Sequence, residues 1–393
     1  MARICVIRQH YVPQDTRVAR EVAVLVESGY EVDVICLRER GEPRLERDGG
    51  VTVRRLPLRH TRRGVVRYLI EYVVFFLMAT CLVAVLHVRH RYRLVQVNSI
   101  PDTLVFAAGV PRLFGARVLL DLQECMPEFL VTKFSISPHH PVVRLVGRFE
   151  QLSIRFADFV ITPTEQMREA FIARGADKTK VSVVMDGADE RIFRPDRDSE
   201  KIGDQSRFTL ICHGTVEERY GLDTVIKAVA LLQDEIPELR FEIYGSGSYL
   251  GHLRQLASEL GVEDRVSFSG CFVPVDELVQ ALAAADVGIV AMKRDAFRDL
   301  TLAGKMFDFI AMRKPMIVSR TRSVEETFGE CCFELFQSND VEDLARAIRA
   351  VHADPKRREQ FIRRAAEVAE PYRWARQREL YRSVVERLIT RGA

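Results

Sequence analysis

The sequence predicts an α/β protein made of two doubly wound, parallel-sheet domains. Short apolar runs alternate with amphipathic segments along almost the whole chain, a pattern typical of the β–α–β units that build parallel sheets. The length of 393 residues exceeds one ordinary core and fits two domains of about 200 residues each. A polar stretch at residues 186–207 interrupts the alternation and is the best candidate for a linker.

The first domain, residues 1–185, is expected to hold a series of strands separated by helices. The helix after the first strand should begin at Asp15 or Thr16, which can cap it, and end before Gly29, since glycine favours the position after a helix. The predicted strands are Arg3–Ile7, Glu31–Cys36, Val51–Leu56, Leu94–Val97, Val118–Asp121, Phe159–Thr162 and Val181–Met185.

The second domain, residues 208–370, repeats the alternation after the linker, and residues 371–393 have a helical pattern that we expect to pack back on the first domain. Doubly wound sheets bind ligands at the carboxyl ends of their strands, so we expect two such domains to face each other across a ligand-binding cleft. The predicted strands are Phe208–His213, Arg240–Tyr244, Val266–Ser269, Val287–Ala291 and Met316–Ser319.

Composition narrows the class of protein. The 58 basic and 55 acidic residues give a net charge of +3, which does not favour a nucleic-acid partner. The 8 cysteines are scattered without a Cys-x-x-Cys pair, so the sequence predicts neither a disulfide framework nor a zinc site. The N-terminal segment starts with a strand and lacks the apolar stretch of a signal peptide. We therefore expect a cytoplasmic protein.

One long apolar segment, residues 65–88, allows two interpretations. Its uninterrupted core at residues 72–86 is shorter than the roughly 20 residues of a spanning helix, and a span would split the predicted sheet. The segment is either a buried helix of the first domain or a helix at the bilayer interface, in which case residues 65–93 contact the membrane. The flanking arginines that favour the second interpretation are Arg59, Arg62, Arg63, Arg67, Arg89, Arg91 and Arg93.

Two glycine-containing turns of the second domain could hold an anion. Gly214 follows a strand and Gly221 precedes a helix, whose exposed amides favour negative charge, and Arg219 between them carries a donor fork suited to phosphate. Gly245 and Gly247 could let a ligand approach the backbone of the next strand–helix turn, although glycines also serve any tight turn. The third glycine of a dinucleotide fingerprint is missing.

A helix predicted to begin near Gly304 carries Lys305 in its first turn and Asp308 one turn later. A lysine there opposes the helix dipole, which makes sense if the lysine and the helix amides share a bound phosphate. Asp308 could then accept hydrogen bonds from a sugar or ribose hydroxyl. The alternative is an ion pair between Lys305 and Asp308 on the helix surface.

Polar side chains follow two strands of the first domain. Asp121, Gln123, Glu124 and Glu128 come after one apolar strand, and the segment from Asn98 to Asp102 follows the preceding strand. Carboxylates at this edge could orient hydroxyls or act as acid–base groups. The alternative is that Asp121, Glu124 and Asp102 cap helices.

With these residues in view, nearly the whole chain resembles glycosyltransferase family 4, the retaining enzymes of the GT-B fold, which consists of two Rossmann-like domains facing each other across a cleft. The resemblance is greatest to bacterial members in exopolysaccharide and lipid-linked glycan assembly. It rests on separated blocks in the family's order: VPQDTRVAREVAVLVESGYEVDVIC, DLQECMPEFL with RFADFVITPTE, HGTVEERYGLDTVIKAVALL, FEIYGSGSYLGHLRQLASELG, RVSFSGCFVP and LAGKMFDFIAMRKPMIVS.

The resemblance implies transfer of a sugar, with retention, from a UDP- or GDP-sugar to a lipid-linked or polysaccharide acceptor, without a metal or other cofactor. It implies a peripheral location at the inner face of the plasma membrane. By position, the implied catalytic residues are Asp121, Gln123 and Glu124, and the acceptor-side residues are Asn98, Asp102 and Glu128. The implied donor-binding residues are Gly214, Thr215, Arg219, Gly221, Gly245, Gly247, Gly270, Cys271, Phe272, Asp299, Thr301, Lys305 and Asp308.

The sequence departs from the family pattern at three positions. Leu300 replaces the first acid of the family's paired-acid motif, which leaves that role to Asp299, and Tyr220 replaces a lysine, which Arg219 could compensate. Gln123 stands where relatives have a histidine near the reacting centre, and glutamine cannot titrate. Gln123 and Leu300 support one alternative, a catalytically silent partner of a membrane glycan complex. A second alternative is another enzyme on the same two-domain plan, a nucleotide-sugar 2-epimerase.

Overall fold

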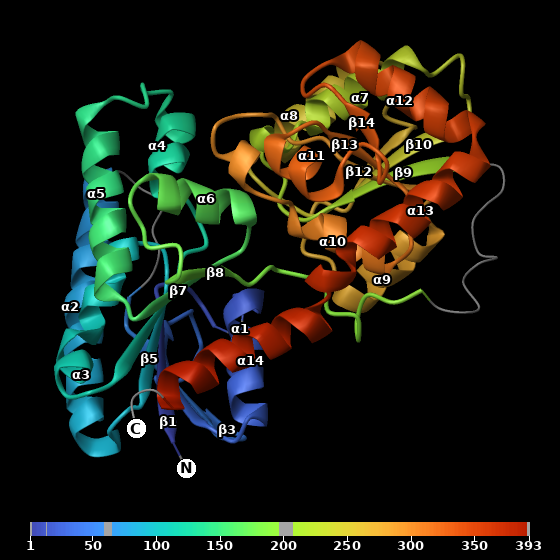
Figure 1. Cartoon of the computed structure of the whole chain (residues 1–393). Helices are drawn as coiled ribbons and strands as arrows, with labels where there is room; N and C mark the ends of the chain where they lie inside the picture. Colours follow the sequence, from blue (N-terminus) through green and yellow to red (C-terminus); the bar gives the residue numbers. More distant parts are fainter. Residues whose placement is uncertain (1, 13, 59–64, 196–206, 391–393) are drawn as a thin grey trace. The chain divides into compact units, whose positions relative to one another are not determined.

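The computed structural model describes residues 2–12, 14–58, 65–195 and 207–390. The chain forms two compact units, one of Met1–Asp186 with Ala375–Ala393 and one of Gly187–Trp374 (Figure 1). Part of the predicted linker, residues 196–206, and the last predicted residues of the C-terminal helix, 391–393, lie outside the described residues.

The first unit contains an eight-stranded sheet in the order β3-β4-β2-β1-β5-β6-β7-β8. All pairs are parallel except β3 with β4, so the expectation of a purely parallel sheet is wrong at this edge. β3 escaped the sequence patterns because all four of its residues are exposed and three are charged. The strands are β1 (Arg3–Arg8), β2 (Glu31–Leu37), β3 (Leu45–Asp48), β4 (Val51–Leu56), β5 (Leu94–Asn98), β6 (Arg117–Asp121), β7 (Phe159–Thr162) and β8 (Val181–Val183).

Helices follow the strands of this sheet, and the ends of the first helix are set by capping residues near it in sequence. In the first helix the side chain of Asp15 accepts a hydrogen bond from the backbone N–H of Val18 at 3.2 Å, and Gly29 has a φ of +83°, as predicted for a capped helix followed by glycine. The helices are α1 (Thr16–Glu27), α2 (Val65–His90), η1 (Asp102–Ala108), α3 (Gly109–Leu113), α4 (Met126–Phe134), α5 (Pro141–Phe156), α6 (Glu165–Ala173) and α14 (Trp374–Thr390).

Helix α2 combines features of both interpretations of the long apolar segment. One side packs on η1, α3 and the sheet and buries Phe75, Ala79 and Val83 completely. The other side leaves large apolar side chains exposed. By length and composition, Leu69–His90 is the one helix among the described residues that could cross a membrane, and only 22% of its most apolar stretch is buried. Arg59, Arg62 and Arg63 of the predicted flank lie outside the described residues.

The second unit contains a parallel six-stranded sheet in the order β11-β10-β9-β12-β13-β14. The chain reverses its direction of growth at β9, and the strand ends at such a switch point are where doubly wound sheets hold ligands. The short strand β14 was missed by sequence reasoning. The strands are β9 (Phe208–His213), β10 (Leu239–Tyr244), β11 (Val266–Phe268), β12 (Val287–Val290), β13 (Met316–Ser319) and β14 (Glu334–Phe336).

An apolar core of the second unit lies between some of its helices and the strands β9, β10 and β12. Within the part of the unit that the structure describes, the α-helices are α7 (Leu222–Leu231), α8 (Leu250–Glu259), α9 (Val275–Ala284), α10 (Gly304–Ala311), α11 (Arg322–Phe328), α12 (Val341–Ala353) and α13 (Pro355–Ala369). The short 3-10 helices are η3 (Glu218–Tyr220), η4 (Arg298–Leu300) and η5 (Glu370–Tyr372).

The last helix, α14, returns to the first unit and packs beside α1 (Figure 1). Arg378 pairs with Glu27, and the Nε of Arg382 donates to the Oγ of Ser28 at 3.1 Å. The hydroxyl of Tyr381, fully buried, donates to the Oε1 of Gln96 at 2.6 Å. A side chain near the C-terminus thus completes a hydrogen bond in the centre of the first sheet.

We predict that Tyr381→Phe destabilises the first unit. The substitution leaves the buried Oε1 of Gln96 without its donor, at a cost of about 1–3 kcal/mol. The melting temperature should fall by about 2–4 °C for each kcal/mol in a unit of this size. Tyr30→Phe is the control, since the hydroxyl of Tyr30 has no hydrogen bond within the described residues. Equal melting temperatures for the two variants would contradict the assignment.

Candidate functional site

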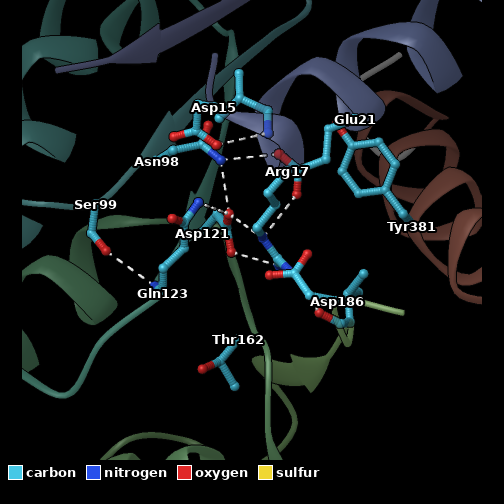
Figure 2. A network of polar contacts seen from close by, with 12 residues as sticks. Asp15, Arg17, Glu21, Asn98, Ser99, Asp121, Gln123, Thr162, Asp186 and Tyr381 are labelled. Carbon is cyan, nitrogen blue, oxygen red and sulfur yellow. Dashed lines mark hydrogen bonds and ion pairs between the residues drawn. The ribbon is translucent and has the colours of Figure 1, made fainter. Parts of the chain in front are cut away.

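A buried ion pair organises the carboxyl ends of β1, β5 and β6 in the first unit (Figure 2). The guanidinium of Arg17 makes two parallel hydrogen bonds to Asp121, from Nε to Oδ2 at 2.8 Å and from Nη2 to Oδ1 at 2.9 Å. Both side chains are buried. The Nη1 of Arg17 also lies 3.0 Å from Asp186. Such two-pronged pairing fixes the plane of the carboxylate.

A second carboxylate, Glu21, lies one helical turn beyond Arg17 and joins this pair to the neighbouring strand. Its Oε1 is 3.4 Å from the Nε of Arg17, and its Oε2 accepts hydrogen bonds from the amides of Gln96 at 2.7 Å and Asn98 at 3.0 Å. Asn98 also donates to the Oδ2 of Asp121 at 2.8 Å. Since Tyr381 donates to Gln96, the network continues from α14 to β6.

Gln123 is held by three hydrogen bonds at the edge of this network. Its Nε2 donates to Asp121 at 2.8 Å, and its backbone N–H donates to the Oγ of Ser99 at 3.1 Å (Figure 2). Its Oε1 accepts from the Nη2 of Arg8 at 3.0 Å. The side chain is half-buried. The orientation of the carboxamide is therefore set by Asp121, and through it by Arg17.

The capping alternative for the first-domain carboxylates is wrong. The N-cap of α4 is Cys125, without a side-chain cap bond, so neither Asp121 nor Glu124 caps this helix. The N-cap of η1 is Pro101, and Asp102 is the first residue of that helix. Asp121 serves the ion pair with Arg17 instead, because its strand ends where α1 presents the guanidinium.

The predicted acceptor-side residues fall into two separate groups. Asn98 is fully buried in the network of Asp121. Glu128 accepts from Arg174 at 2.7 Å, and Arg174 also binds Glu150 with its Nε at 2.8 Å from Oε1.

Burial, followed by the charges of Glu150 and Glu124, raises the pKa of the Asp102 carboxyl well above its usual range. The surroundings of Asp102 thus disfavour the charged form of its carboxyl.

Burial and the charge of Asp121 raise the pKa of Glu21 to about 8, despite the opposing charge of Arg17. The pKa of Arg17 itself lies well above its usual range, because Asp121, Asp186 and Glu21 outweigh the effect of burial. Near neutral pH, Glu21 therefore keeps its proton, and the ion pairs of Arg17 are those with Asp121 and Asp186.

We predict that Glu21→Gln removes a pH dependence of stability. The unfolded chain releases this proton near pH 4.3, about the value for free glutamate. The contribution of the protonated Glu21 to the free energy of unfolding is therefore fully present below that pH and is lost as the pH rises through about 8. The melting temperature of the variant relative to the natural protein should rise progressively between acidic and alkaline pH. Glu27→Gln, at the exposed end of the same helix, should show no such trend, and an identical trend in both variants would contradict the assignment.

In the second unit, Lys305 reaches across from the first turn of α10 to the loop after β9. Its Nζ lies 3.6 Å from the Sγ of Cys212 and 4.7 Å from the centre of the Tyr220 ring. A Cβ at Gly214 would lie 3.7 Å from this ammonium. The guanidinium of Arg219 lies 5.1 Å from the same ring. The predicted residues Gly214, Arg219 and Lys305 thus gather around Tyr220, which orients both cations by cation–π contacts.

The ammonium of Lys305 lies at the amino end of α10, whose N-cap, Ala303, makes no side-chain cap bond. The first turn of α10 contains no acidic residue. The exposed amides of a helix start attract anions, and the nearby ammonium adds a full positive charge. This arrangement suits the diphosphate of a nucleotide.

Sequence reasoning missed His213, which ends β9 beside Gly214. Its Nε2 lies 3.6 Å from the Oδ2 of Asp308, and its ring packs edge-on against Phe309. Burial and the charge of Lys305 lower the pKa of His213 to about 3, so the ring is neutral near pH 7. The Nε2 is buried without a hydrogen-bond partner in the described structure. A polar residue ending an apolar strand was the only signal available for it.

The glycines of the next turn serve packing of the backbone. A Cβ at Gly245 would lie 1.9 Å from the carbonyl oxygen of Gly214, and one at Gly247 would lie 2.0 Å from that of Val216. Gly245 also has a φ of +145°, a conformation that favours glycine. The neighbouring loop thus leaves no room for a Cβ at either glycine. Gly221 is similarly close to the carbonyl of Ala291.

The remaining predicted donor-binding residues have varied surroundings. Asp299 accepts from the Nε of Arg294 and from the backbone N–H of Arg322, both at 2.9 Å, so this carboxylate braces two loops. Thr301 directly follows η4, and Thr215 is exposed beside Gly214. Gly270, Cys271 and Phe272 lie in the loop after β11, in which the Phe272 side chain is 83% exposed.

Comparison with known proteins shows the family of this chain. Residues 14–187 match the glycosyl transferase 4-like domain, and residues 194–368 match the glycosyl transferases group 1 domain. The chain belongs to glycosyltransferase family 4. Members of this family depend on nucleotide sugars and have the GT-B fold of two parallel α/β sheets, as found in the two units described above.

Among curated relatives, a GDP-mannose-dependent α-(1-6)-phosphatidylinositol monomannoside mannosyltransferase of Mycolicibacterium smegmatis is 28% identical over 51% of this chain and 54% of its own length. The sulfoquinovosyl transferase SQD2 of Arabidopsis thaliana is 23% identical over 70% of this chain and 53% of its own length. The chain thus spans about half the length of these relatives. The putative colanic acid biosynthesis glycosyl transferase WcaI of Escherichia coli is 24% identical over 68% of this chain and 69% of its own length.

Solved structures agree on the fold. Sucrose-phosphate synthase from Thermosynechococcus elongatus superposes with a TM-score of 0.78 at 19% identity and covers 99% of this chain and 100% of its own. Anabaena HepE, solved with UDP and glucose, gives a TM-score of 0.72 at 15% identity over 98% of this chain and 100% of its own. The GT-B fold predicted from the sequence is confirmed.

Proposed function

We propose that this protein transfers a sugar from a UDP- or GDP-sugar, with retention of configuration and without a metal, to a lipid-linked or polysaccharide acceptor at the inner face of the plasma membrane. The observation that carries the proposal is the cluster of Lys305, Arg219 and the start of α10 around Tyr220. Two cations and a helix start can neutralise the departing diphosphate, which is the role that a metal has in other transferases.

At the polar edge of the first sheet, the side chain of Gln123 has no titratable proton to contribute to the reaction. In our proposal the acceptor oxygen forms its bond to the sugar on the face from which the diphosphate leaves, and the acceptor's proton passes to an oxygen of that diphosphate. Gln123 then needs only to orient the sugar by hydrogen bonding, and its carboxamide is already held by Asp121 and Arg8. The histidine of relatives is not required for this step.

Two observations favour an acceptor carried on a lipid. The mycobacterial relatives are named for mannosyl transfer to a phosphatidylinositol mannoside. In this chain, α2 carries an exposed apolar stripe that we define as Leu69, Ile70, Val73, Leu77, Val85 and Val88. A second stripe on α5, with helical spacing, consists of Val142, Leu145, Phe149 and Leu152. Because both helices pack on η1, the two stripes belong to the same side of the sheet.

An exposed apolar surface of this kind favours contact with a bilayer over contact with water. A helix that lies on the bilayer keeps the whole sheet on one side of the membrane, whereas a span would divide it. The protein would then be peripheral and act where a lipid-linked acceptor presents its sugar.

We predict that the double variant Arg219→Ala, Lys305→Ala binds nucleotide sugars much more weakly. Charge-assisted hydrogen bonds contribute about 1.5–3 kcal/mol each, so loss of both cations should weaken binding about 100-fold or more. Calorimetric titration with UDP- and GDP-sugars in the presence of a metal chelator measures the effect. Arg313→Ala, Arg363→Ala is the control pair, because both side chains belong to the second unit and line a cavity at α13. Unchanged affinity in the first pair would show that the donor site is misplaced, and binding that requires a metal would refute metal independence.

We predict that Val73→Ser, Leu77→Ser weakens binding to lipid vesicles. Each apolar side chain that enters the bilayer contributes about 1.5–3 kcal/mol, so the pair should lower the partition coefficient at least about 10-fold. Leu231→Ser, Leu260→Ser removes two exposed leucines from the second unit and should have little effect. Equal effects of the two pairs in vesicle flotation would contradict a role for the α2 stripe.

One observation favours a second candidate, a catalytically silent partner of a membrane glycan complex. Gln123 replaces the family's histidine, and hydrogen bonds to Arg8 and Asp121 already engage its carboxamide. Glycosyl transfer that appears only in Gln123→His would favour the silent partner. Interconversion of donor sugars in the absence of any acceptor would instead favour a nucleotide-sugar 2-epimerase.

A further inference from the structure

A cavity of about 730 Å³ lies at the amino ends of the first unit's strands, where Arg3, Arg47, Arg54 and Arg89 line it together with His90. We call it the arginine pocket. The strand ends opposite to it carry Gln123 and Asp121. β1 itself runs from Arg3 in the pocket to Arg8, which binds Gln123, and five residue steps at about 3.3 Å each separate the two ends by roughly 17 Å. The arginine pocket is therefore distinct from the proposed transfer site.

The pocket contains cations that the protein itself does not neutralise. Arg3 pairs with Glu31, and Arg54 lies with its Nε 2.9 Å from the Oδ1 of the buried Asp33. Within the described residues, Arg47 and Arg89 are exposed and have no carboxylate within ion-pair distance. The one further lining carboxylate is Asp48, so the four guanidinium groups outnumber the surrounding carboxylates, Glu31, Asp33 and Asp48, by one.

The pKa of His90 reflects the excess of positive charge around the pocket. Burial lowers its pKa below the usual value, and the charges of Arg3, Arg54 and Arg89 lower it further against the opposing effect of Asp33. The Nη1 of Arg3 lies 2.8 Å from the Nδ1 of His90, which places a guanidinium directly against the ring. The neutral histidine does not change the net charge of the pocket, in which guanidinium groups outnumber carboxylates.

The position of the pocket links it to the apolar surface. Arg89 and His90 are the last residues of α2, and Val88, at the end of the exposed α2 stripe, directly precedes them. A helix that lies on a bilayer by this stripe brings its C-terminal residues to the level of the lipid headgroups. The pocket then opens where phosphate groups of anionic lipids are concentrated.

We propose that the arginine pocket binds the phosphate of an anionic phospholipid headgroup and so fixes the first unit on the membrane surface. Guanidinium groups hold phosphate with two parallel hydrogen bonds, which a diffuse surface charge does not supply. The α2 stripe supplies the affinity for any bilayer, and the pocket supplies the preference for an anionic one. Membrane contact is part of the proposed function, whereas lipid recognition by this pocket goes beyond it.

The test is flotation with vesicles of phosphatidylcholine alone and of phosphatidylcholine with about 30 mol% phosphatidylglycerol. The full chain should bind the anionic vesicles more tightly. Arg47→Ala, Arg89→Ala should lower the partition coefficient for anionic vesicles about 10-fold or more and leave that for neutral vesicles almost unchanged. Arg47→Lys, Arg89→Lys keeps the charge but loses the paired donors. Its affinity for anionic vesicles should lie between that of the natural protein and that of the alanine pair.

The matched control is Arg40→Ala, Arg44→Ala, which removes the same charge from the neighbouring loop, outside the pocket. If the two alanine pairs lost equal affinity for anionic vesicles, diffuse electrostatic attraction would explain the binding and the proposal would be overturned. It would also be overturned if the natural protein bound neutral and anionic vesicles equally well. Release of bound protein by inorganic phosphate, at the same phosphate concentration as the vesicles, would assign the pocket to a soluble phosphate instead. Binding does not depend on glycosyl transfer, so an inactive protein that shows the predicted lipid preference would refute the proposed function alone.

Discussion

The buried pairing of Arg17 with Asp121 is the interaction on which the polar edge of the first sheet depends. A guanidinium and a carboxylate removed from water are costly unless each satisfies the other, and loss of one partner leaves an uncompensated charge in the core. Here the pair aligns α1 with β6, fixes the carboxamide of Gln123 and leaves Glu21 protonated. The same pair therefore joins α1 to the sheet and positions the side chains at this edge.

Sequence reasoning found most of the strands, the cap of α1 and the glycine after it, because these depend on local patterns. It missed β3, whose exposed polar residues pair only through the backbone, and it did not foresee that Arg17 and Glu21 would be buried. Both lie on the apolar face of α1, one turn apart, and a charged pair at such positions is the signal that was available. The partners, Asp121 and Gln96, are too distant in sequence for any local pattern to indicate.

The second unit shows how contacts between elements distant in sequence determine the surroundings of single residues. Tyr220 replaces a lysine of the family, yet the ammonium of Lys305 reaches the same ring from another helix. His213 is buried beside that ammonium and is neutral for this reason. Gly245 and Gly247 are required by the neighbouring backbone. The identity of the cluster was predictable from the family's motifs, whereas its arrangement around Tyr220 was not.

The central claim, that this chain is an active transferase for a lipid-carried acceptor, is tested most directly by product formation. Membranes that contain the protein would be incubated with a panel of radiolabelled UDP- and GDP-sugars, and the label in the extracted lipid would be counted. We expect one nucleotide sugar to label the lipid fraction, and Lys305→Ala to abolish the signal. Label that enters no lipid or polysaccharide from any donor, with the protein folded and membrane-bound, would contradict the account.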